Sequence, residues 1–331
     1  MRVISGKYKG RRILPPIKEG VRPTYDKVKE AMFALLARDI DGATVIDLFA
    51  GTGGLGIEAL SRGAQKVYFC DNSGASLEVV KKNTEYCPDE EKEILRGDFS
   101  DCLRKLSVRK VKADIILCDP PYGKGIPEQA LALISEYGLL AENGVIIVER
   151  SASDLPVKKY FTYVTEKTYG EICLDVCRNI TKCAVTGSFD PFTLGHKYVV
   201  KKALDNFDFV YVVMLNNENK QARYSVEKRL RMAELSLTDY KKRIKVEYYG
   251  GMTVDYCKDN GIKTIYRGYR NSEDFEYEKV MASYNKEHGD VDTVLVQAES
   301  SISSTDVKRI FDEGGNIENY VCDDVYRLMR R

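Results

Sequence analysis

One short segment combines small residues, hydroxyl groups and a histidine in a pattern suited to phosphate chemistry. It is the run Gly187 to His196, Gly-Ser-Phe-Asp-Pro-Phe-Thr-Leu-Gly-His, and it follows the apolar stretch Cys183–Thr186. Small residues expose backbone amides, and the N-terminus of a helix favours a bound anion. The pattern therefore predicts a strand, a phosphate-binding loop and a helix that begins near Gly195, with His196 in the anion site.

Other charged and hydroxyl groups follow expected strands in the same half of the chain. Lys220 follows residues 210–215, Arg267-Gly268-Tyr269-Arg270 follows 264–266, and Ser301 to Thr305 follows 291–297. Strand ends of open parallel sheets are where ligands bind. Attack of an acceptor phosphate on a nucleoside triphosphate requires positioning and charge neutralisation rather than a protein nucleophile. Taken separately, Lys220 is typical of a surface lysine and Ser303-Ser304 of a helix cap.

The first half of the chain contains a second glycine-rich loop. The apolar run 44–49 precedes it and an expected helix over 57–61 follows it. The spacing G-x-G-x-x-G is formed by Gly51, Gly53 and Gly56. Missing side chains let the backbone approach a ligand beside a helix N-terminus. The next expected strand, 66–70, ends at Asp71, which can accept hydrogen bonds from ribose hydroxyls, so a nicotinamide cofactor and S-adenosylmethionine fit equally well.

The segment Asp119-Pro120-Pro121-Tyr122 decides between those two ligands. It directly follows the expected strand 114–118. The exocyclic amine of a nucleobase is a poor nucleophile because its lone pair is delocalised, and Asp119 and the Pro120 carbonyl can accept its N–H bonds. Two prolines stiffen the loop, and Tyr122 can stack on a flipped base. The segment favours methyl transfer to a base amine; the alternative is a proline-rich turn with a capping aspartate.

On these residues, the segment 1–180 resembles the bacterial 16S ribosomal RNA guanine-N2-methyltransferases. The basic leader over residues 1–24, with Ser5 to Arg12 and Arg22-Pro23-Thr24, adds to the resemblance. The resemblance implies that S-adenosyl-L-methionine binds at Asp47, Gly51, Gly53, Gly56, Asp71 and Asp98. It also implies catalytic roles for Asp119, Pro120 and Tyr122 and RNA contacts by Lys7, Lys9, Arg11, Arg12 and Arg22. The family commonly has Glu in place of Asp71, and Asp98 also fits a simple turn.

Charge supports a polyanionic partner for the leader. Residues 1–38 contain ten Lys or Arg against three Asp or Glu, although the net charge of the chain is +1. Phosphate neutralisation drives nucleic-acid binding, while the alternative is an ordinary solvated basic surface. By resemblance the partner is 16S rRNA or a small ribosomal subunit particle. An adenine amino group in DNA is the rival substrate, since Asp119 to Tyr122 would serve it as well.

The segment 182–331 resembles the bacterial phosphopantetheine adenylyltransferases. The discriminating run is Arg267-Gly268-Tyr269-Arg270-x-x-x-Asp274-Phe275-Glu276-Tyr277-Glu278. The resemblance implies ATP contacts by Gly187, Ser188, Phe189, His196, Gly268, Arg270, Glu278, Ser300, Ser301, Ile302, Ser303, Ser304 and Thr305. It implies that 4′-phosphopantetheine contacts Ser188, Lys220, Thr253 and Arg267. By the same resemblance, His196 stabilises the pentacovalent phosphorus and Mg²⁺ assists the reaction. The resemblance also implies a hexameric assembly. The alternative substrate for this half is another phosphorylated acceptor.

Length and composition place these sites in two domains of one chain. With 331 residues the chain is long enough for two cores, which we expect at 1–180 and 182–331. A last strand of the first domain is predicted over 169–176, and a tether over 177–182. Each half is expected to be a three-layer, Rossmann-like α/β fold with a mainly parallel sheet.

Composition also indicates where the chain works. No apolar run approaches the roughly 20 residues needed to span a bilayer, and the N-terminus lacks the apolar core of a signal peptide. We therefore expect a cytoplasmic protein whose nine cysteines are buried thiols, with no metal site at Cys173, Cys177 and Cys183. The interpretation is a bifunctional enzyme. The alternative from another class is that one half has become a binding or assembly module.

Overall fold

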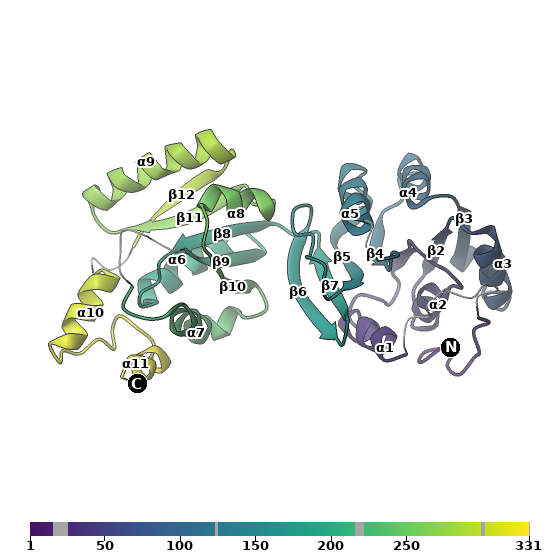
Figure 1. Cartoon of the computed structure of the whole chain (residues 1–331), viewed down its shortest axis with the longest axis horizontal. Helices are drawn as coiled ribbons and strands as arrows, with labels where there is room; N and C mark the ends of the chain where they lie inside the picture. Colours follow the sequence, from purple (N-terminus) through teal and green to yellow (C-terminus); the bar gives the residue numbers. More distant parts are fainter. Residues whose placement is uncertain (16–25, 123–124, 216–221, 299–301, 331) are drawn as a thin grey trace. The chain divides into compact units, whose positions relative to one another are not determined.

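The computed structural model describes residues 1–15, 26–122, 125–215, 222–298 and 302–330. Over these residues the chain forms two compact units, Met1–Ile180 and Thr181–Arg331. Each unit contains its own sheet, and Figure 1 shows their helices and strands.

The first unit is built on a seven-stranded sheet with the order β3-β2-β1-β4-β5-β7-β6. Its strands are β1 (Thr44–Asp47), β2 (Lys66–Asp71), β3 (Lys92–Arg96), β4 (Ala113–Cys118), β5 (Leu140–Ser151), β6 (Thr162–Tyr169) and β7 (Ile172–Arg178). Its helices are α1 (Asp26–Leu35), α2 (Gly54–Ser61), α3 (Gly74–Asn83), α4 (Phe99–Val108) and α5 (Ile126–Glu136), with the 3-10 turn η1 (Asp89–Glu91). β1 to β5 run parallel, and β7 is antiparallel to both of its neighbours.

The central strands of this sheet are apolar on both faces because helices cover both. Val45 of β1 packs in one core with α1, α2 and α3, and the next residue, Ile46, packs in a second core with α4 and α5. The same alternation holds for Ile115 and Ile116 of β4. Parallel strands that are buried on both faces consist of continuous runs of apolar residues, as these do. The predicted three-layer α/β fold is confirmed for this unit.

The end of the first unit differs from the prediction. The expected single strand over 169–176 is a hairpin, in which β6 ends at Tyr169 and β7 begins at Ile172. Gly170 adopts a positive φ of 63°, which suits the first position of a two-residue hairpin loop. β7 continues to Arg178, and β8 of the second unit begins at Lys182, so the connection spans residues 179–181 and not the predicted 177–182.

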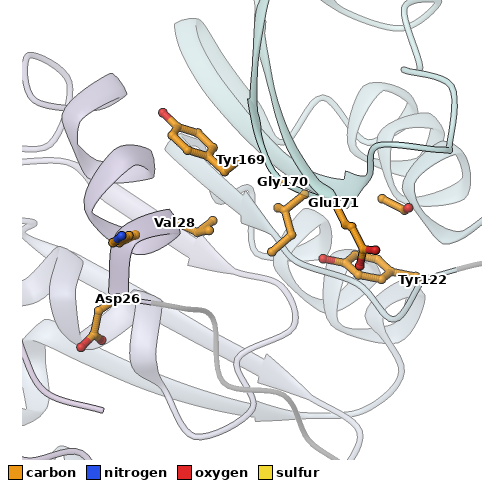
Figure 2. A pocket seen from close by; sticks show the side chains of 9 residues that line it. Asp26, Val28, Tyr122, Tyr169, Gly170 and Glu171 are labelled. Carbon is orange, nitrogen blue, oxygen red and sulfur yellow. The ribbon is translucent and has the colours of Figure 1, made fainter.

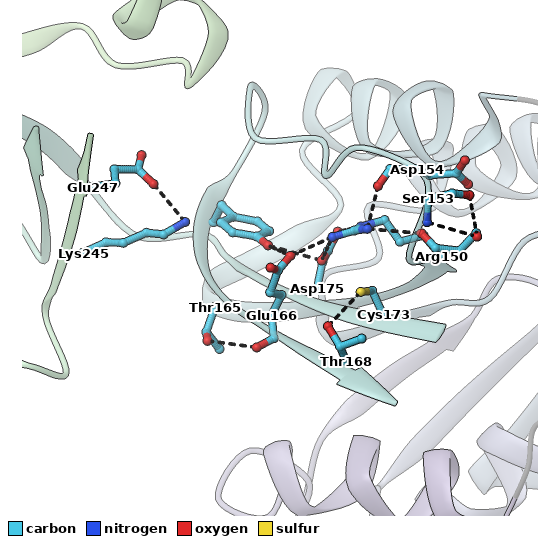
Figure 3. Close-up of polar contacts among 12 residues, drawn as sticks. Arg150, Ser153, Asp154, Thr165, Glu166, Thr168, Cys173, Asp175, Lys245 and Glu247 are labelled. Atoms are coloured by element: carbon cyan, nitrogen blue, oxygen red, sulfur yellow. Dashed lines mark hydrogen bonds and ion pairs between the residues drawn. The ribbon is translucent and has the colours of Figure 1, made fainter. Parts of the chain in front are cut away.

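A buried ion-pair network ties this hairpin to β5. The Arg150 guanidinium donates to both carboxylate oxygens of Asp175 on β7, at 2.7 and 3.0 Å. It also donates to Glu166 on β6 at 2.7 Å and to the Asp154 carbonyl at 2.6 Å, as Figure 3 shows. A buried charge that lost its partners would be costly. The network therefore fixes the carboxyl end of β5, which carries Glu149 beside Arg150.

Glu58 and Ser61 of α2 dock the described part of the basic leader, and Glu58 does so with a buried carboxylate. Glu58 accepts the N–H groups of Ile4 and Ser5 at 2.7 and 3.0 Å. Its carboxylate also lies 3.4 Å from Nζ of Lys29 on α1, and both side chains are fully buried. Lys29 in turn donates to the Arg2 carbonyl at 2.7 Å. Burial lowers the pKa of Lys29, and Glu58 opposes that shift.

Replacing Glu58 by leucine is expected to destabilise the first unit by about 3–5 kcal/mol, because the Lys29 charge would stay buried without its carboxylate partner. Urea unfolding followed by hydrogen exchange measures this, with peptides from residues 182–331 as internal reference. Glu78→Leu is the matched control, since Glu78 pairs with Lys81 on the exposed surface of α3, where an ion pair contributes little, and should leave the unfolding midpoint nearly unchanged. Equal unfolding midpoints for the two variants would contradict the buried pair's role.

The second unit is built on a five-stranded, fully parallel sheet with the order β10-β9-β8-β11-β12. Its strands are β8 (Lys182–Gly187), β9 (Phe209–Leu215), β10 (Ile244–Tyr249), β11 (Thr264–Tyr269) and β12 (Asp292–Gln297). Its helices are α6 (Leu194–Leu204), α7 (Val226–Ser236), α8 (Thr253–Asp259), α9 (Ser272–Gly289), α10 (Ser304–Asp312) and α11 (Asp323–Met329), with the 3-10 turn η2 (Thr238–Tyr240).

Helices cover both faces of this sheet as well. Val210 and Val212 of β9 pack in a core with α6, α7, α10 and α11. Tyr211, between them, contacts Tyr256 of α8 on the other face, with ring centroids 6.4 Å apart. The predicted three-layer α/β fold is confirmed here too. Among the residues that the structure describes, no helix combines the length and apolar character needed to cross a membrane.

Candidate active sites

The glycine loop of the first unit joins β1 to α2. Gly51 and Gly53 have positive φ angles of 54° and 86°, which side chains rarely adopt. α2 begins at Gly54, three residues before the predicted start. At Gly56 an added Cβ would lie 2.3 Å from the Phe69 ring of β2, so this position needs a glycine for close helix–strand packing. The three glycines thus serve two local functions, turning the chain and packing α2 against the sheet.

Two carboxylates hold this loop in place. The Gly56 N–H donates to Asp47 at 2.8 Å, and the Gly51 N–H donates to Asp71 at 2.8 Å. Asp47 is only 1% exposed, and burial, with the charges of Asp119 and Asp71, raises its pKa to about 7. Asp71 is half-buried and also accepts the Ser73 N–H at 2.8 Å. Asp47 therefore supports the loop from inside, and Asp71 lies where a ligand can reach it.

Asp98 lies at the neighbouring strand end and is exposed. Its side chain accepts the Ser100 N–H at 3.0 Å and caps α4. The register pairs Asp71 with Arg96, so Asp98 follows β3 beside the end of β2. A capping role and a ligand contact both remain consistent with this placement, and the donor contact stays a prediction.

Tyr122 and Glu149 form the second part of this site. The Tyr122 hydroxyl donates to Oε1 of Glu149 at 2.8 Å. Tyr122 is 41% exposed, whereas Glu149, near the end of β5, is 4% exposed. β4 and β5 pair with Cys118 opposite Val148, so the next residues, Asp119 and Glu149, are neighbours across the sheet. Burial and then the charge of Asp119 raise the pKa of Glu149 to about 7.

Sequence reasoning missed Glu149. It ends the apolar run 145–148, as Asp119 ends the run 115–118. The sequence feature that could have identified Glu149 as a site residue was therefore an acidic residue at the end of a buried strand. Only the register of the sheet shows that the two carboxyl groups are adjacent.

A cavity of about 760 Å³ opens beside Tyr122. Figure 2 shows Asp26 and Val28 of α1 on one side and Tyr122 and Glu171 on the other. Its lining residues come from α1, the end of β5 and the β6–β7 hairpin, and are Asp26, Lys27, Val28, Tyr122, Ser151, Tyr169, Gly170, Glu171 and Ile172. An aromatic side chain with an exposed face on such a cavity suits a base taken out of its helix.

The leader presents its predicted RNA-binding residues on the surface. Lys7, Lys9, Arg11 and Arg12 are all exposed. Lys7 pairs with Glu91 at 2.8 Å, and the Arg11 guanidinium lies 4.0 Å from the Tyr86 ring centroid. Arg22 lies outside the described residues. Of these four cations, Lys9 and Arg12 make no side-chain hydrogen bond or ion pair with another described residue.

In the second unit, the predicted phosphate loop joins β8 to α6. β8 ends at Gly187, where an added Cβ would lie 2.8 Å from the Phe189 ring. Phe189 itself is buried, with its ring centroid 5.0 Å from that of His196. The Ser188 carbonyl accepts a hydrogen bond from Arg229 at 2.7 Å. The side chains of Phe189 and Arg229 thus hold the loop in place. Because the Phe189 side chain is buried, this residue can contribute to a ligand site mainly through its backbone.

His196 is held at the start of α6 by a reciprocal cap. The Thr193 N–H donates to Nδ1 of His196 at 3.0 Å, and the Thr193 hydroxyl accepts the His196 N–H. Burial, followed by the charges of Arg270 and Arg267, lowers the pKa of His196 to about 3. The ring is therefore neutral at physiological pH. Because Nδ1 accepts a hydrogen bond, Nε2 carries the ring proton and acts as a donor.

The protonation of His196 can be measured directly, since the chain has only two histidines. We expect the His196 ring-proton NMR shift to stay constant from pH 8 to pH 5, because protonation begins only as the pH approaches about 3. His196→Ala assigns the signal by removing it, and the remaining signal belongs to His288. A His196 signal that titrates between pH 5 and pH 7 would contradict the environment described.

The two predicted arginines lie at the end of β11. Arg267 makes a two-point ion pair with Glu278 of α9, at 2.7 and 2.9 Å, and donates to the Thr186 carbonyl at 2.6 Å. Arg270 donates to Asp274 at 2.7 Å. Arg267 and Glu278 were predicted to contact different ligands, and in the structure they contact each other. Their ligand roles stay predictions.

The start of α10 carries several of the predicted ATP-binding residues. Ser303 caps α10 and bonds Asp306, while the Ser304 hydroxyl donates to the Pro191 carbonyl at 3.3 Å. Ile302 and Thr305 flank these two, Gly268 lies in β11, and Thr253 begins α8. Lys220, Ser300 and Ser301 lie outside the described residues. The structure brings the start of α10 to the phosphate loop through the Ser304 contact.

Asp190 and Lys308 are further residues at this site that sequence reasoning missed. Lys308 of α10 donates to Asp190 at 2.7 Å, and the N–H groups of Arg223 and Tyr224 donate to the same carboxylate at 3.0 and 3.1 Å. Although burial opposes the shift, these bonds hold the pKa of Asp190 below its ordinary value. Asp190 therefore joins the phosphate loop, α10 and the segment before α7.

Comparison with known proteins assigns each unit. Residues 1–178 match the family described as Conserved hypothetical protein 95, and residues 184–310 match the family described as Cytidylyltransferase-like. "Putative rRNA methyltransferase YlbH" of Bacillus subtilis (strain 168) is 39% identical over 173 residues, which cover 51% of this chain and 94% of the relative. The phosphopantetheine adenylyltransferase of Staphylococcus carnosus (strain TM300) is 34% identical over 154 residues, 45% of this chain and 95% of the relative.

The chain belongs to the Conserved hypothetical protein 95 family through its first unit and to the phosphopantetheine adenylyltransferases through its second. It is a fusion of a methyltransferase-like unit of the Conserved hypothetical protein 95 family with a phosphopantetheine adenylyltransferase unit. Among solved structures, "Putative methyltransferase yhhF from Escherichia coli" is 29% identical and covers 54% of this chain and 97% of its own, with a TM-score of 0.48. The glycine loop and Asp119 lie in the methyltransferase-like unit, and His196 lies in the adenylyltransferase unit.

Proposed function

We propose that the methyltransferase-like unit transfers a methyl group from S-adenosyl-L-methionine to the N2 amine of a guanine in 16S rRNA. The observation that carries the proposal is the exposed Tyr122 ring on a cavity of about 760 Å³, three residues after Asp119. A guanine stacked on Tyr122 would present its amine to the Asp119 carboxylate and the Pro120 carbonyl, which accept its N–H bonds.

The donor is proposed to bind along the glycine loop. S-adenosylmethionine supplies an electrophilic methyl group on a sulfonium centre. Asp71 is half-buried and Asp98 is exposed, and they lie at neighbouring strand ends. Both carboxylates offer acceptors for the hydroxyl and amine groups of the donor. Asp47 holds the loop through Gly56 and so would support the donor indirectly. The exposed cations of the leader would neutralise RNA phosphates.

Tritiated methyl transfer followed by nucleoside analysis tests the substrate. Unmethylated small ribosomal particles, free 16S rRNA and duplex DNA would be offered in parallel to the full chain. We expect N2-methylguanosine from at least one of the RNA substrates. Methylated adenine from DNA, with no RNA product, would replace this proposal by the rival one.

We propose that the second unit transfers AMP from ATP to 4′-phosphopantetheine, giving dephospho-coenzyme A and pyrophosphate. The observation that carries it is a neutral His196 with a donating Nε2 at the N-terminus of α6, close enough to Arg267 and Arg270 for both charges to lower its pKa. His196 would donate to an equatorial oxygen of the α-phosphorus as the acceptor phosphate attacks. ATP is expected to bind as its Mg²⁺ complex.

Pyrophosphate release with purified chain tests this reaction. Phosphopantetheine is expected to support release, and pantetheine without its phosphate is expected to fail because the attacking oxygen is missing. Release with a different phosphorylated acceptor at equal or higher efficiency would change the substrate and leave adenylyl transfer in place. The two assays run on one preparation also decide whether both units turn over or one serves only as a module.

A further inference from the structure

Glu149 lies beside the proposed methyl-transfer residues, and the mechanism above does not use it. It is 4% exposed, and its Oε1 accepts the Tyr122 hydroxyl at 2.8 Å. Its other oxygen, Oε2, is buried and accepts no hydrogen bond from a donor among the described residues, and the Glu149 carboxyl interacts with the carboxyl of Asp119. A buried carboxylate oxygen that lacks a hydrogen bond is costly, so its retention at this place indicates a function.

Among the described residues, the surroundings of Glu149 contain a second acid, and no ion pair between Glu149 and a basic side chain is formed there. Asp119 follows β4 at the position next to Glu149, and its charge acts on Glu149. The residue opposite Glu149 on β7 is the apolar Leu174. Asp26, Lys27 and Glu171 are the other charged residues that line the cavity beside Tyr122. Arg150 is committed to Asp175 and Glu166, so it does not compensate Glu149.

Glu149 is buried and Asp119 is half-buried. Adjacent carboxyl groups in such a place titrate as a pair, because the charge of one disfavours ionisation of the other. Such a pair can hold one proton near neutral pH and take up a further one. Burial and the charge of Asp119, which raise the pKa of Glu149 to about 7, are consistent with this.

We propose that Glu149 is a positioning residue for methyl transfer, which orients Tyr122 through its hydroxyl and shares with Asp119 the proton that the acceptor amine loses. This inference rests on the proposed function. In the step, the amine nitrogen forms a bond to the methyl carbon, and the bond from that carbon to sulfur breaks with its electrons moving to sulfur. One N–H bond breaks, its electron pair stays on nitrogen, and the proton passes to Asp119 within the pair.

The test compares Glu149→Gln, Glu149→Asp and Glu142→Gln in single-turnover methyl transfer to small ribosomal particles. Glutamine can still accept the Tyr122 hydroxyl but cannot share a proton. We expect its rate at neutral pH to fall by about 10- to 100-fold and its acidic limb to move to lower pH, because Asp119 loses the neighbouring charge. Aspartate should recover part of the rate. Glu142 lies at the exposed opposite end of β5 and should behave as the wild type.

A second readout needs no activity. Infrared absorption of protonated carboxyl groups in the free protein should show a group that titrates near neutral pH and disappears in Glu149→Gln. Asp47→Asn provides the reference, since burial also raises the pKa of Asp47 to about 7. A wild-type protein without this carboxyl, or a folded Glu149→Gln with unchanged rate and pH profile, would overturn the inference. If the wild type and Glu142→Gln transfer no methyl group to RNA, the proposed function fails instead.

Discussion

Replacement of His196 by alanine is expected to lower adenylyl transfer by about 10²- to 10³-fold, the cost of removing one donor to developing charge. The ring is neutral and its Nδ1 is occupied by the Thr193 N–H, so only Nε2 can donate to the phosphorus oxygens. Pyrophosphate release at saturating ATP and phosphopantetheine measures the effect. Methyl transfer by the same preparation should be unchanged.

His288→Ala is the matched control for this variant. His288 is the other histidine of the chain, near the exposed end of α9, and its removal should leave pyrophosphate release intact. His196→Ala also removes one contact of the α6 cap, so thermal melting must show that the second unit stays folded. A folded His196→Ala with wild-type pyrophosphate release would remove His196 from the mechanism.

Replacement of Asp119 by alanine is expected to lower methyl transfer by at least about 10²-fold, because the acceptor amine loses a charged hydrogen-bond acceptor and the Glu149 pair loses one member. Single-turnover transfer of tritiated methyl groups to small ribosomal particles measures this. Pyrophosphate release should not change, and loss of both activities would argue against independent sites.

Asp119→Asn separates two contributions of the carboxylate. The amide keeps an acceptor oxygen and loses the negative charge, so an intermediate rate is expected if hydrogen bonding and proton uptake both matter. Asp114→Asn is the matched control, since Asp114 lies at the opposite, exposed end of β4 and bonds the Thr44 N–H at 2.8 Å. Unchanged methyl transfer in Asp119→Ala would remove the Asp119 assignment.

Local patterns were sufficient to predict the elements that carry both sites. Apolar runs with glycine turns predicted β1, β2, β4 and β8 close to their observed bounds. Strands buried on two faces are continuous apolar runs, which are easy to recognise in a sequence. Thr193 to His196 predicted the start of α6, where the cap uses neighbouring residues only. The β6–β7 hairpin was missed, because Tyr169-Gly170-Glu171 interrupts a run of strand-forming residues only briefly, and a single positive φ turns the chain.

By itself, the sequence determined which residues carry reactive groups and that each group follows a strand, since both are properties of short segments. Tertiary structure alone decided what those groups contact. Glu149 is 30 residues from Asp119 along the chain, and the β4–β5 register makes them neighbours. Likewise, the Lys308–Asp190 and Arg267–Glu278 pairs form only when helices pack on the sheet. Contacts between distant residues depend on the whole fold, so no local pattern contains them.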